Sequence, residues 1–385
     1  MIRLAAVLGI VLVFNACTQD DPSNQESRGD DAGPDISTAR VLALDPRTGA
    51  ENWRHVTSST QIGAVGGSAE VAIIGTEQEV LALDPASGQE RWRFPITVNG
   101  FRYERPEVFE DTVVAGTNEG DGAWVALDAA TGAERWRIPE GRRFGFVIER
   151  AGDLLVAEAG NPNDLTYRLV ALRVADGREV WSVDLGRPKT SVWTAASETT
   201  VFATGWTDEL RALDAATGQL LWSAPFQSFP QSLAYLHDML VVTATELRHP
   251  DEYTTVVALD PTTARELWRI EWKGSGPLPT SEHPASNGDS LFLFTGEREV
   301  SSIDPATGKI RWSAPTSVPS HAVALAANQH SLFLTTGTSV VALNTSDGTE
   351  QWRERVSAYG THIIPTAYED RLLVSVGGKA PPHRD

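Results

Sequence analysis

The chain repeats one short pattern of apolar and polar positions eight times. In each copy an alternating apolar segment such as Val-x-Ala-Leu leads into a turn such as Asp-Pro-x-Thr-Gly, and the copy closes on a Trp. The alternation predicts a β-strand, and a turn with Pro second and Gly last predicts a hairpin. The closing residues lie 39 to 46 positions apart and are Trp53, Trp92, Trp136, Trp181, Trp222, Trp268, Trp312 and Trp352.

A second pair of short apolar runs precedes each hairpin after the first, as at residues 107–108 and 112–115. A period of this length holds four strands with their turns. It would also hold two helices, but Pro and Gly in nearly every turn argue against helical repeats. We therefore predict an all-β fold, an eight-bladed β-propeller over residues 38–385.

The order of the strands at the two ends of the chain predicts how the ring closes. Residues 40–55 form a hairpin with no strand pair before it, and residues 363–376 form a strand pair with no hairpin after it. We expect the two ends to combine into one composite blade. Such closure removes the open edges that a linear stack of sheets would leave.

Two columns of the repeat predict how the blades pack. Four residues before the turn Asp the chain is apolar in every copy, and two residues before it is small. We expect the small column to receive the Trp of an adjacent blade, with each such Trp contributing about 3–5 kcal/mol. Trp124 stands in the apolar column and is expected in the core. Three turns depart from the pattern, at Arg173, Ala264 and Asn344.

Charge and Cys content exclude several classes of function. The net charge is −19, which disfavours nucleic acid as a partner because phosphate neutralisation needs a basic surface. The chain has one Cys, so it forms no internal disulfide and no Cys-based zinc site.

The N-terminus has the layout of an exported lipoprotein. Residues 1–16 resemble a lipoprotein signal peptide, Cys17 is the predicted lipidation site, and residues 17–37 lack the apolar residues that would order them. We interpret 17–37 as a tether and 38–385 as the propeller. The alternative is an ordinary cleaved signal in which the Cys has no role.

The repeat resembles a known family. The A-x-D-x-x-x-G-x-x-x-W signature is similar to the tryptophan-docking motif of pyrroloquinoline quinone (PQQ)-type propeller repeats, and the whole chain resembles the BamB-like family of outer-membrane assembly lipoproteins. This resemblance implies a monomeric protein-binding scaffold that is anchored to the outer membrane and faces the periplasm. Its partners would be the barrel-assembly machinery or unfolded outer-membrane proteins. The alternative is a small-molecule or PQQ-binding propeller with a redox or sensing role.

The same resemblance bears on catalysis. PQQ-dependent dehydrogenases hold the quinone against a ring formed by two adjacent Cys residues, and this chain has one Cys. We therefore expect no enzyme activity, no catalytic residues and no PQQ or other cofactor. Three residues near the predicted channel, His283, His321 and His362, either bind a metal or are simply polar strand ends; the second interpretation leaves the protein without a metal site.

One face of the propeller is expected to bind a partner. The turns within the hairpins are regular, whereas the connections on the opposite side vary in length, as at 160–168, 245–253 and 270–282. Aromatic and Arg residues are enriched at interface hot spots. The candidates on that side are Arg102, Tyr103, Arg105, Tyr167, Trp193, Trp206, Tyr253 and Trp272. The alternative is that these side chains only cover loop edges.

Overall fold

The computed structural model describes most of the chain from residue 38 onward. The described ranges are 38–68, 70–96, 106–117, 123–138, 143–161, 166–186, 192–204, 209–226, 228–248, 251–273, 284–296, 298–316, 324–357 and 363–378. The predicted signal peptide, Cys17 and the tether lie outside these ranges. Within them, no helix has the length and apolarity needed to cross a membrane.

The described residues form eight four-stranded antiparallel sheets, as the repeat predicted. Blade 1 consists of β3 (Ile62–Gly67), β4 (Ala72–Thr76), β5 (Glu79–Leu83) and β6 (Glu90–Pro95). Blade 2 consists of β7 (Glu107–Phe109), β8 (Thr112–Thr117), β9 (Ala123–Asp128) and β10 (Glu134–Arg137). Blade 3 consists of β11 (Arg143–Ala151), β12 (Leu154–Asn161), β13 (Thr166–Arg173) and β14 (Glu179–Gly186). Blade 4 consists of β15 (Trp193–Ala196), β16 (Thr200–Thr204), β17 (Glu209–Asp214) and β18 (Leu220–Pro225).

The second half of the ring follows the same plan. Blade 5 consists of β19 (Phe229–Leu236), β20 (Met239–Arg248), β21 (Asp251–Leu259) and β22 (Glu266–Lys273). Blade 6 consists of β23 (Ala285–Ser286), β24 (Leu291–Gly296), β25 (Glu299–Ile303) and β26 (Ile310–Pro315). Blade 7 consists of β27 (Leu325–Ala327), β28 (Ser331–Thr335), β29 (Ser339–Asn344) and β30 (Glu350–Arg355). Blade 8 consists of β31 (Ile363–Ala367), β32 (Leu372–Val376), β1 (Arg40–Leu44) and β2 (Glu51–Val56).

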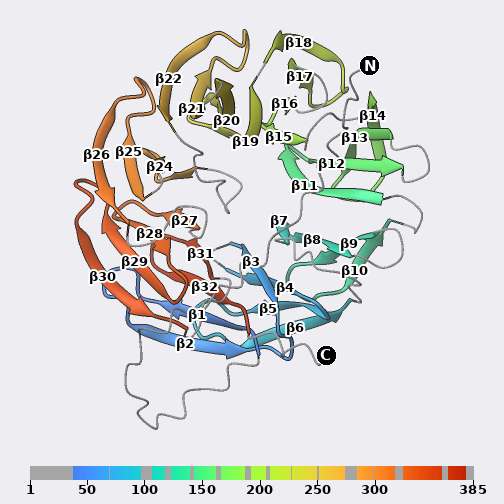
Figure 1. Ribbon diagram of the computed structural model, residues 1–385. Coiled ribbons are helices and arrows are strands. Elements are labelled where there is room, and N and C mark those ends of the chain that lie inside the picture. Colours follow the sequence, from blue (N-terminus) through green and yellow to red (C-terminus); the bar gives the residue numbers. More distant parts are fainter. Residues whose placement is uncertain are drawn as a thin grey trace, which may run out of the picture. The chain divides into compact units, whose positions relative to one another are not determined.

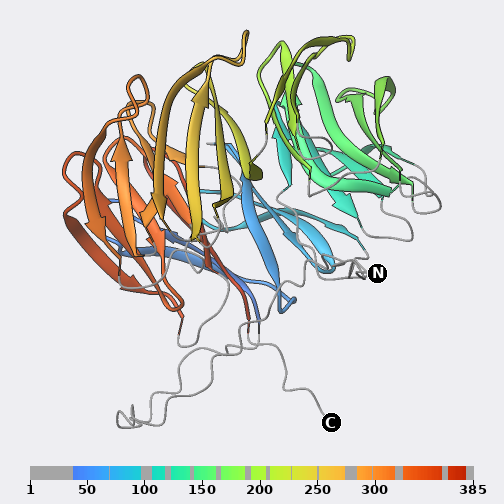
Figure 2. The ribbon, with the colours of Figure 1, turned by 45° about the horizontal axis from the view of Figure 1, so that its top comes forward.

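The composite blade confirms the predicted closure. Strand β1 pairs antiparallel with β32, with Arg40 opposite Val376 and Leu44 opposite Leu372. The blades surround a common centre, with strands such as β3 and β31 innermost and strands such as β2 and β30 at the rim (Figure 1 and Figure 2). The result is an eight-bladed β-propeller in which the first hairpin completes the last sheet.

The core of the propeller lies between neighbouring blades. Val41 and Ala43 of blade 8, for example, share one buried cluster with Leu81 and Leu83 of blade 1. The apolar column is buried in every blade, and Trp124 in that column is 2% exposed, as predicted. Each blade is therefore held mainly by the faces of its two neighbours.

The predicted role of the small column was wrong. Trp53 lies directly opposite Ala43 on the adjacent strand of its own blade, so the two side chains share one face. The small residue therefore makes room beside the Trp of its own blade. In the next blade the Trp53 indole donates a hydrogen bond of 3.1 Å to the carbonyl of Pro85, and its ring lies against Gly88.

All eight closing Trp residues make the same contact with the next hairpin turn. Each indole Nε1–H donates to a backbone carbonyl at 2.7 to 3.1 Å. In the order of the Trp residues, the acceptors are Pro85, Ala129, Val174, Ala215, Pro261, Pro305, Thr345 and Pro46. Burying the ring and pairing its one polar atom lets a large side chain seal each junction at low cost.

The three irregular turns differ in how they are stabilised. In a regular turn the carboxylate of Asp45 accepts two backbone N–H groups of its own turn at 2.8 and 3.0 Å. The amide oxygen of Asn344 substitutes for it by accepting a backbone N–H at 2.8 Å. Arg173 has no acceptor to offer and instead pairs with Asp176 at 3.1 Å. Ala264 adopts φ +57°, the left-handed conformation that Gly adopts in the other seven turns.

Candidate partner-binding face

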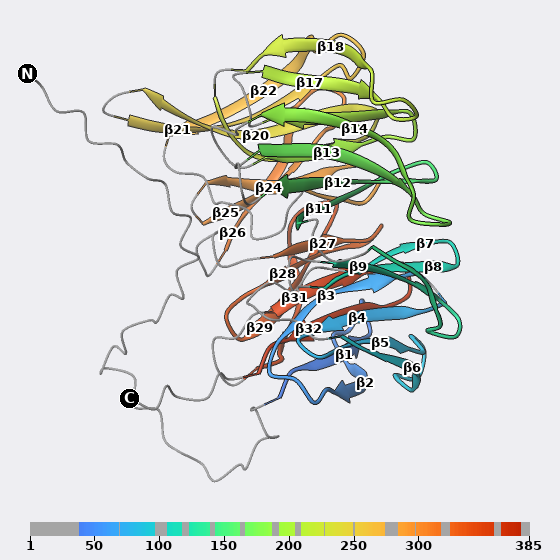
Figure 3. The same ribbon diagram turned by 90° about the vertical axis from the view of Figure 1, so that its right-hand side faces the viewer.

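The variable face contains more strand than the sequence indicated. Segment 245–253 was expected to be a loop, but β20 runs to Arg248 and β21 starts at Asp251. The two strands remain paired to their ends, with Glu246 opposite Tyr253 and Arg248 opposite Asp251. Segment 160–168 is likewise partly strand, and β22 extends to Lys273. Figure 3 shows the β20–β21 hairpin reaching out on the left of the view.

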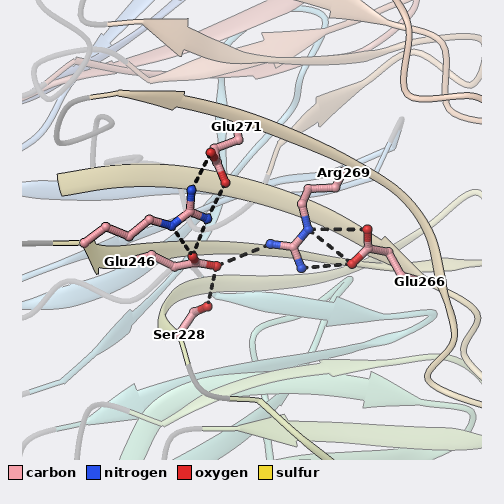
Figure 4. Close-up of polar contacts among 6 residues, drawn as sticks. Ser228, Glu246, Glu266, Arg269 and Glu271 are labelled. Atoms are coloured by element: carbon pink, nitrogen blue, oxygen red, sulfur yellow. Dashed lines mark hydrogen bonds and ion pairs between the residues drawn. The ribbon is translucent and has the colours of Figure 1, made fainter. Parts of the chain in front are cut away.

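The long hairpin carries an ordered cluster of charges. The Arg248 guanidinium donates to Glu246 at 2.7 Å and to both carboxylate oxygens of Glu271 at 2.6 and 2.7 Å. Glu246 also accepts a hydrogen bond of 2.9 Å from the Ser228 hydroxyl and one of 3.3 Å from Arg269 (Figure 4). Each Glu therefore has a cationic donor, and Arg248 is clamped between two carboxylates.

An aromatic ring completes this arrangement. The Arg248 guanidinium lies 4.7 Å from the centre of the Tyr253 ring, within range of a cation–π interaction. Beside it, Lys273 and Asp251 form an ion pair of 2.9 Å. We call Ser228, Glu246, Arg248, Tyr253, Arg269 and Glu271 the Arg248 cluster.

The cluster is ordered but open to water. The hydrogen bonds that Arg248 donates to Glu271 and then to Glu246 raise its pKa above the usual value. Burial pushes the pKa of Glu246 upward, but hydrogen bonds from Arg248 and Ser228 outweigh it and lower the pKa overall. The Arg248 side chain is 47% exposed and that of Glu246 is 22% exposed. Such pairs add little stability, but they hold side chains in place before a partner arrives.

The cluster lies on blade 5 and on the segment that leads into it. Ser228 directly precedes β19 of blade 5, and Glu246, Arg248 and Glu271 belong to strands of the same blade. Trp193 of β15 packs against the buried cluster that blades 4 and 5 share.

The predicted site residues have different surroundings. Tyr253 belongs to the Arg248 cluster, whereas Trp193 and Trp272 pack, partly buried, against the cores between blades 4 and 5 and between blades 5 and 6. Within the described ranges, the indole N–H groups of these two Trp residues are buried without an acceptor. The backbone of Tyr167 pairs within β13. The side chain of Tyr167 and the residues Arg102, Tyr103, Arg105, Trp206, His283, His321 and His362 lie outside what the structure describes.

Sequence reasoning missed the charged members of the cluster. Glu246 and Arg248 stand two positions apart on one strand, and Arg269 and Glu271 do so on another. Alternate positions of a strand share a face, so this spacing was a usable signal. The sequence prediction placed residues 245–253 in a loop, where spacing does not indicate a shared face, whereas the structure has strand up to Arg248 and again from Asp251.

The described part of the chain has no group of three His, Cys, Asp or Glu side chains placed to hold a metal ion. The chemistry that the face offers is recognition by charged hydrogen bonds and an aromatic ring. A partner with a complementary charged or polar segment could exchange for, or add to, the ion pairs of the Arg248 cluster.

Comparison with known proteins gives a family and a fold. The family model described as "Outer membrane protein assembly factor BamB" matches residues 37–159, 166–320 and 252–380. The crystal structure of BamB from Moraxella catarrhalis is 17% identical, with a TM-score of 0.58, and the match covers 88% of this chain and 98% of that one. No curated protein matches the sequence.

Two other solved structures share the architecture. The computationally designed Ika8 protein is 15% identical with a TM-score of 0.61, and the match covers 83% of this chain and 97% of that one. Sqt1 of Saccharomyces cerevisiae is 12% identical with a TM-score of 0.60, covering 88% and 98%. At these identities the likeness shows the propeller fold alone.

Proposed function

The chain belongs to the BamB-like family of propeller proteins, and we propose that it is a protein-binding scaffold in outer-membrane β-barrel protein assembly. Its partners would be subunits of the assembly machinery or unfolded outer-membrane proteins. The family match, which extends over nearly all of the propeller, supports this role. The single Cys of the chain supports a scaffold without PQQ, because the chain cannot form the ring of two adjacent Cys residues that holds the quinone in PQQ-dependent dehydrogenases.

The observation that carries the proposal is the Arg248 cluster. Arg and Tyr are typical hot-spot residues, and here they stack on each other at a half-exposed position. The two carboxylates that hold Arg248 fix its direction in the free protein. A partner therefore meets a preorganised surface and loses less conformational entropy on binding.

The N-terminus would keep this surface near a membrane. We propose that residues 1–16 direct export, that Cys17 carries the lipid anchor and that residues 17–37 tether the propeller on the periplasmic side of the outer membrane. Replacing Cys17 by Ser should release the protein into the soluble periplasmic fraction. Retention of the Cys17→Ser variant in the membrane would contradict the anchor.

Affinity purification from outer membranes tests the scaffold. Barrel-assembly subunits should co-purify with the wild-type chain, and the double variant R248A/Y253A should lose most of them. The matched control is R353A, because Arg353 is also a surface Arg, 42% exposed and paired with Glu350. It should retain the partners.

Three results would contradict the proposal. The first is equal partner recovery with R248A/Y253A, and the second is equal loss with R353A. The third is recovery of a bound chromophore that absorbs in the near ultraviolet in place of protein partners. That third result would support the small-molecule or redox propeller instead.

A further inference from the structure

The outermost strand of each blade is an open edge. Each of these strands pairs with one neighbour in its sheet, so alternate backbone N–H and C=O groups point outward. The eight edge strands are β2, β6, β10, β14, β18, β22, β26 and β30. Proteins commonly protect such edges with charged side chains, because a foreign strand that pairs with the edge would bury these charges, which is unfavourable.

Five of these edges carry the same protective ion pair. A Glu two positions before the closing Trp pairs with the Arg directly after it, at 2.6 to 3.1 Å. The pairs are Glu51–Arg54, Glu90–Arg93, Glu134–Arg137, Glu266–Arg269 and Glu350–Arg353. Strand β14 has two acidic residues in place of the pair, and β26 has Arg311.

Strand β18 of blade 4 is the exception among the eight. Its sequence, Leu-Leu-Trp-Ser-Ala-Pro, contains no charged residue. Leu220 and Leu221, which precede the closing Trp, are 59% and 54% exposed. Covering large apolar side chains that are this exposed lowers the free energy, and this favours the binding of a partner. The edge thus combines unpaired backbone groups, an apolar surface and no protecting charge.

We propose that β18 accepts an added β-strand from a partner protein. The partner segment is extended and has aliphatic side chains at alternate positions, so that its backbone pairs with the edge while its side chains cover Leu220 and Leu221. It is neutral or basic, because the chain carries a net charge of −19. The same charge disfavours a second copy of this chain as the occupant.

This surface is separate from the Arg248 cluster and stands independently of the proposed function. It lies on the outer edge of blade 4, whereas Glu246, Arg248 and Glu271 belong to blade 5. Variants at the two sites therefore distinguish the two proposals. Loss of assembly subunits with R248A/Y253A says nothing about strand addition to β18.

The test uses the full chain and the blocked peptide Lys-Thr-Val-Thr-Val-Thr-Val-Thr-Lys. At saturation, hydrogen–deuterium exchange of residues 219–225 should slow about tenfold or more, because added backbone hydrogen bonds protect the edge. A control peptide with Pro in place of the three Val residues keeps the charge but cannot form the ladder, and it should give no protection. Absence of saturable binding, or protection confined to other residues, would overturn the proposal.

A matched pair of variants tests whether the peptide binds at β18. L220E/S223R rebuilds on β18 the ion pair of the five protected blades and should weaken peptide binding about tenfold or more. I310E/S313R adds the same charges to β26 and should leave binding unchanged. Equal binding by L220E/S223R, or equal loss with I310E/S313R, would overturn the assignment.

Two further measurements keep the test decisive. If L220E/S223R does not fold, L221R replaces it, because blades 1, 2 and 6 have Arg at this position, as Arg91, Arg135 and Arg311. Sedimentation velocity checks for self-association. A dimer that L220E/S223R or L221R dissociates would mean that a second copy occupies the edge, contrary to the proposal.

Discussion

Trp352 donates its indole N–H to the carbonyl of Pro46 at 3.0 Å, across 306 residues of sequence. The ring also lies against Gly49, where an added Cβ would come within 2.7 Å of it. This contact joins the last complete blade to the hairpin at the start of the propeller. It repeats the junction between successive blades and, together with the pairing of β1 and β32, closes the ring.

Removing this closing side chain should destabilise the whole domain. We expect W352A to lower the free energy of unfolding by about 3 kcal/mol, the lower end of the range for aromatic truncations, since a partly buried aromatic ring and its packing are lost. W352F keeps most of the ring and loses the hydrogen bond, so it should cost less, about 1–2 kcal/mol. Urea denaturation followed by Trp fluorescence and circular dichroism measures both. A loss with W352A no larger than that with W352F would show that the ring does not seal the junction.

A substitution in the turn at Ala264 should stabilise the protein. Ala264 has φ +57°, and the adjacent Trp222 still reaches the carbonyl of Pro261 at 3.0 Å. Because a Cβ is disfavoured in this conformation, A264G should stabilise the protein by about 1 kcal/mol. Thermal unfolding of the wild type and the variant provides the measurement.

The converse substitution is the control for this turn. Gly308 has φ +69°, and a Cβ there would lie 2.7 Å from the Trp268 ring. G308A should therefore destabilise by more than A264G stabilises, by roughly 1–3 kcal/mol or more. A neutral G308A would show that the turn and the ring adapt freely, and A264G would then have no physical reason to stabilise the protein.

Glu158 should make stability depend on pH near neutrality. Burial raises the pKa of this β12 carboxyl to about 7, above its ordinary value of 4.5. The folded state therefore binds a proton more tightly than the unfolded state, and stability decreases as pH rises from about 4.5 to about 7. Above pH 7 the full cost of the buried charge, at most about 3 kcal/mol, is present.

Replacing this carboxyl by an amide isolates the effect. E158Q should be more stable than the wild type at pH 8 and should lose that advantage at pH 5, as measured by urea denaturation at both values. The turn carboxylates of Asp84 and Asp128 do not interfere, because hydrogen bonds from Arg91 and Arg135 hold their pKa values at about 2. An advantage of E158Q that is the same at both pH values would contradict the assignment.

The Arg248 cluster should affect binding more than stability. Its ion pairs are partly exposed, so R248A should change the free energy of unfolding by less than about 1 kcal/mol. Partner recovery should decrease with the same variant, because the guanidinium and its stacking on Tyr253 are lost. Calorimetric unfolding and the affinity purification together measure the two effects. A large loss of stability would mean that Arg248 is a structural residue.

Much of the fold was predictable because the repeat is local. A hairpin such as Asp45 to Trp53 carries its own turn chemistry, and eight copies at one period leave few architectures. The composite blade followed from counting strands, and the burial of Trp124 followed from its column. None of these conclusions required the distance between two remote residues.

The site required the tertiary structure. The Arg248 cluster brings Ser228, Glu246 and Glu271 together from three separate segments, and its geometry depends on how far β20 and β21 remain paired. The neighbours of Trp53 likewise depend on cross-strand register, because the register places Ala43 of the same blade directly opposite Trp53. Sequence periodicity determines which residues share a strand face, but register and the neighbouring blade decide what that face meets.

For strand β18, too, the sequence determined one part of the site and the tertiary structure the other. The sequence alone determined that Leu220 and Ser223 stand where five other blades have a Glu and an Arg framing the Trp, and that Leu221 follows Leu220. Only the tertiary structure showed that this strand is an edge and that both leucines are exposed. An uncharged strand is unremarkable inside a sheet and becomes a binding surface only when its backbone has no neighbour, because pairing in three dimensions decides which polar groups remain free.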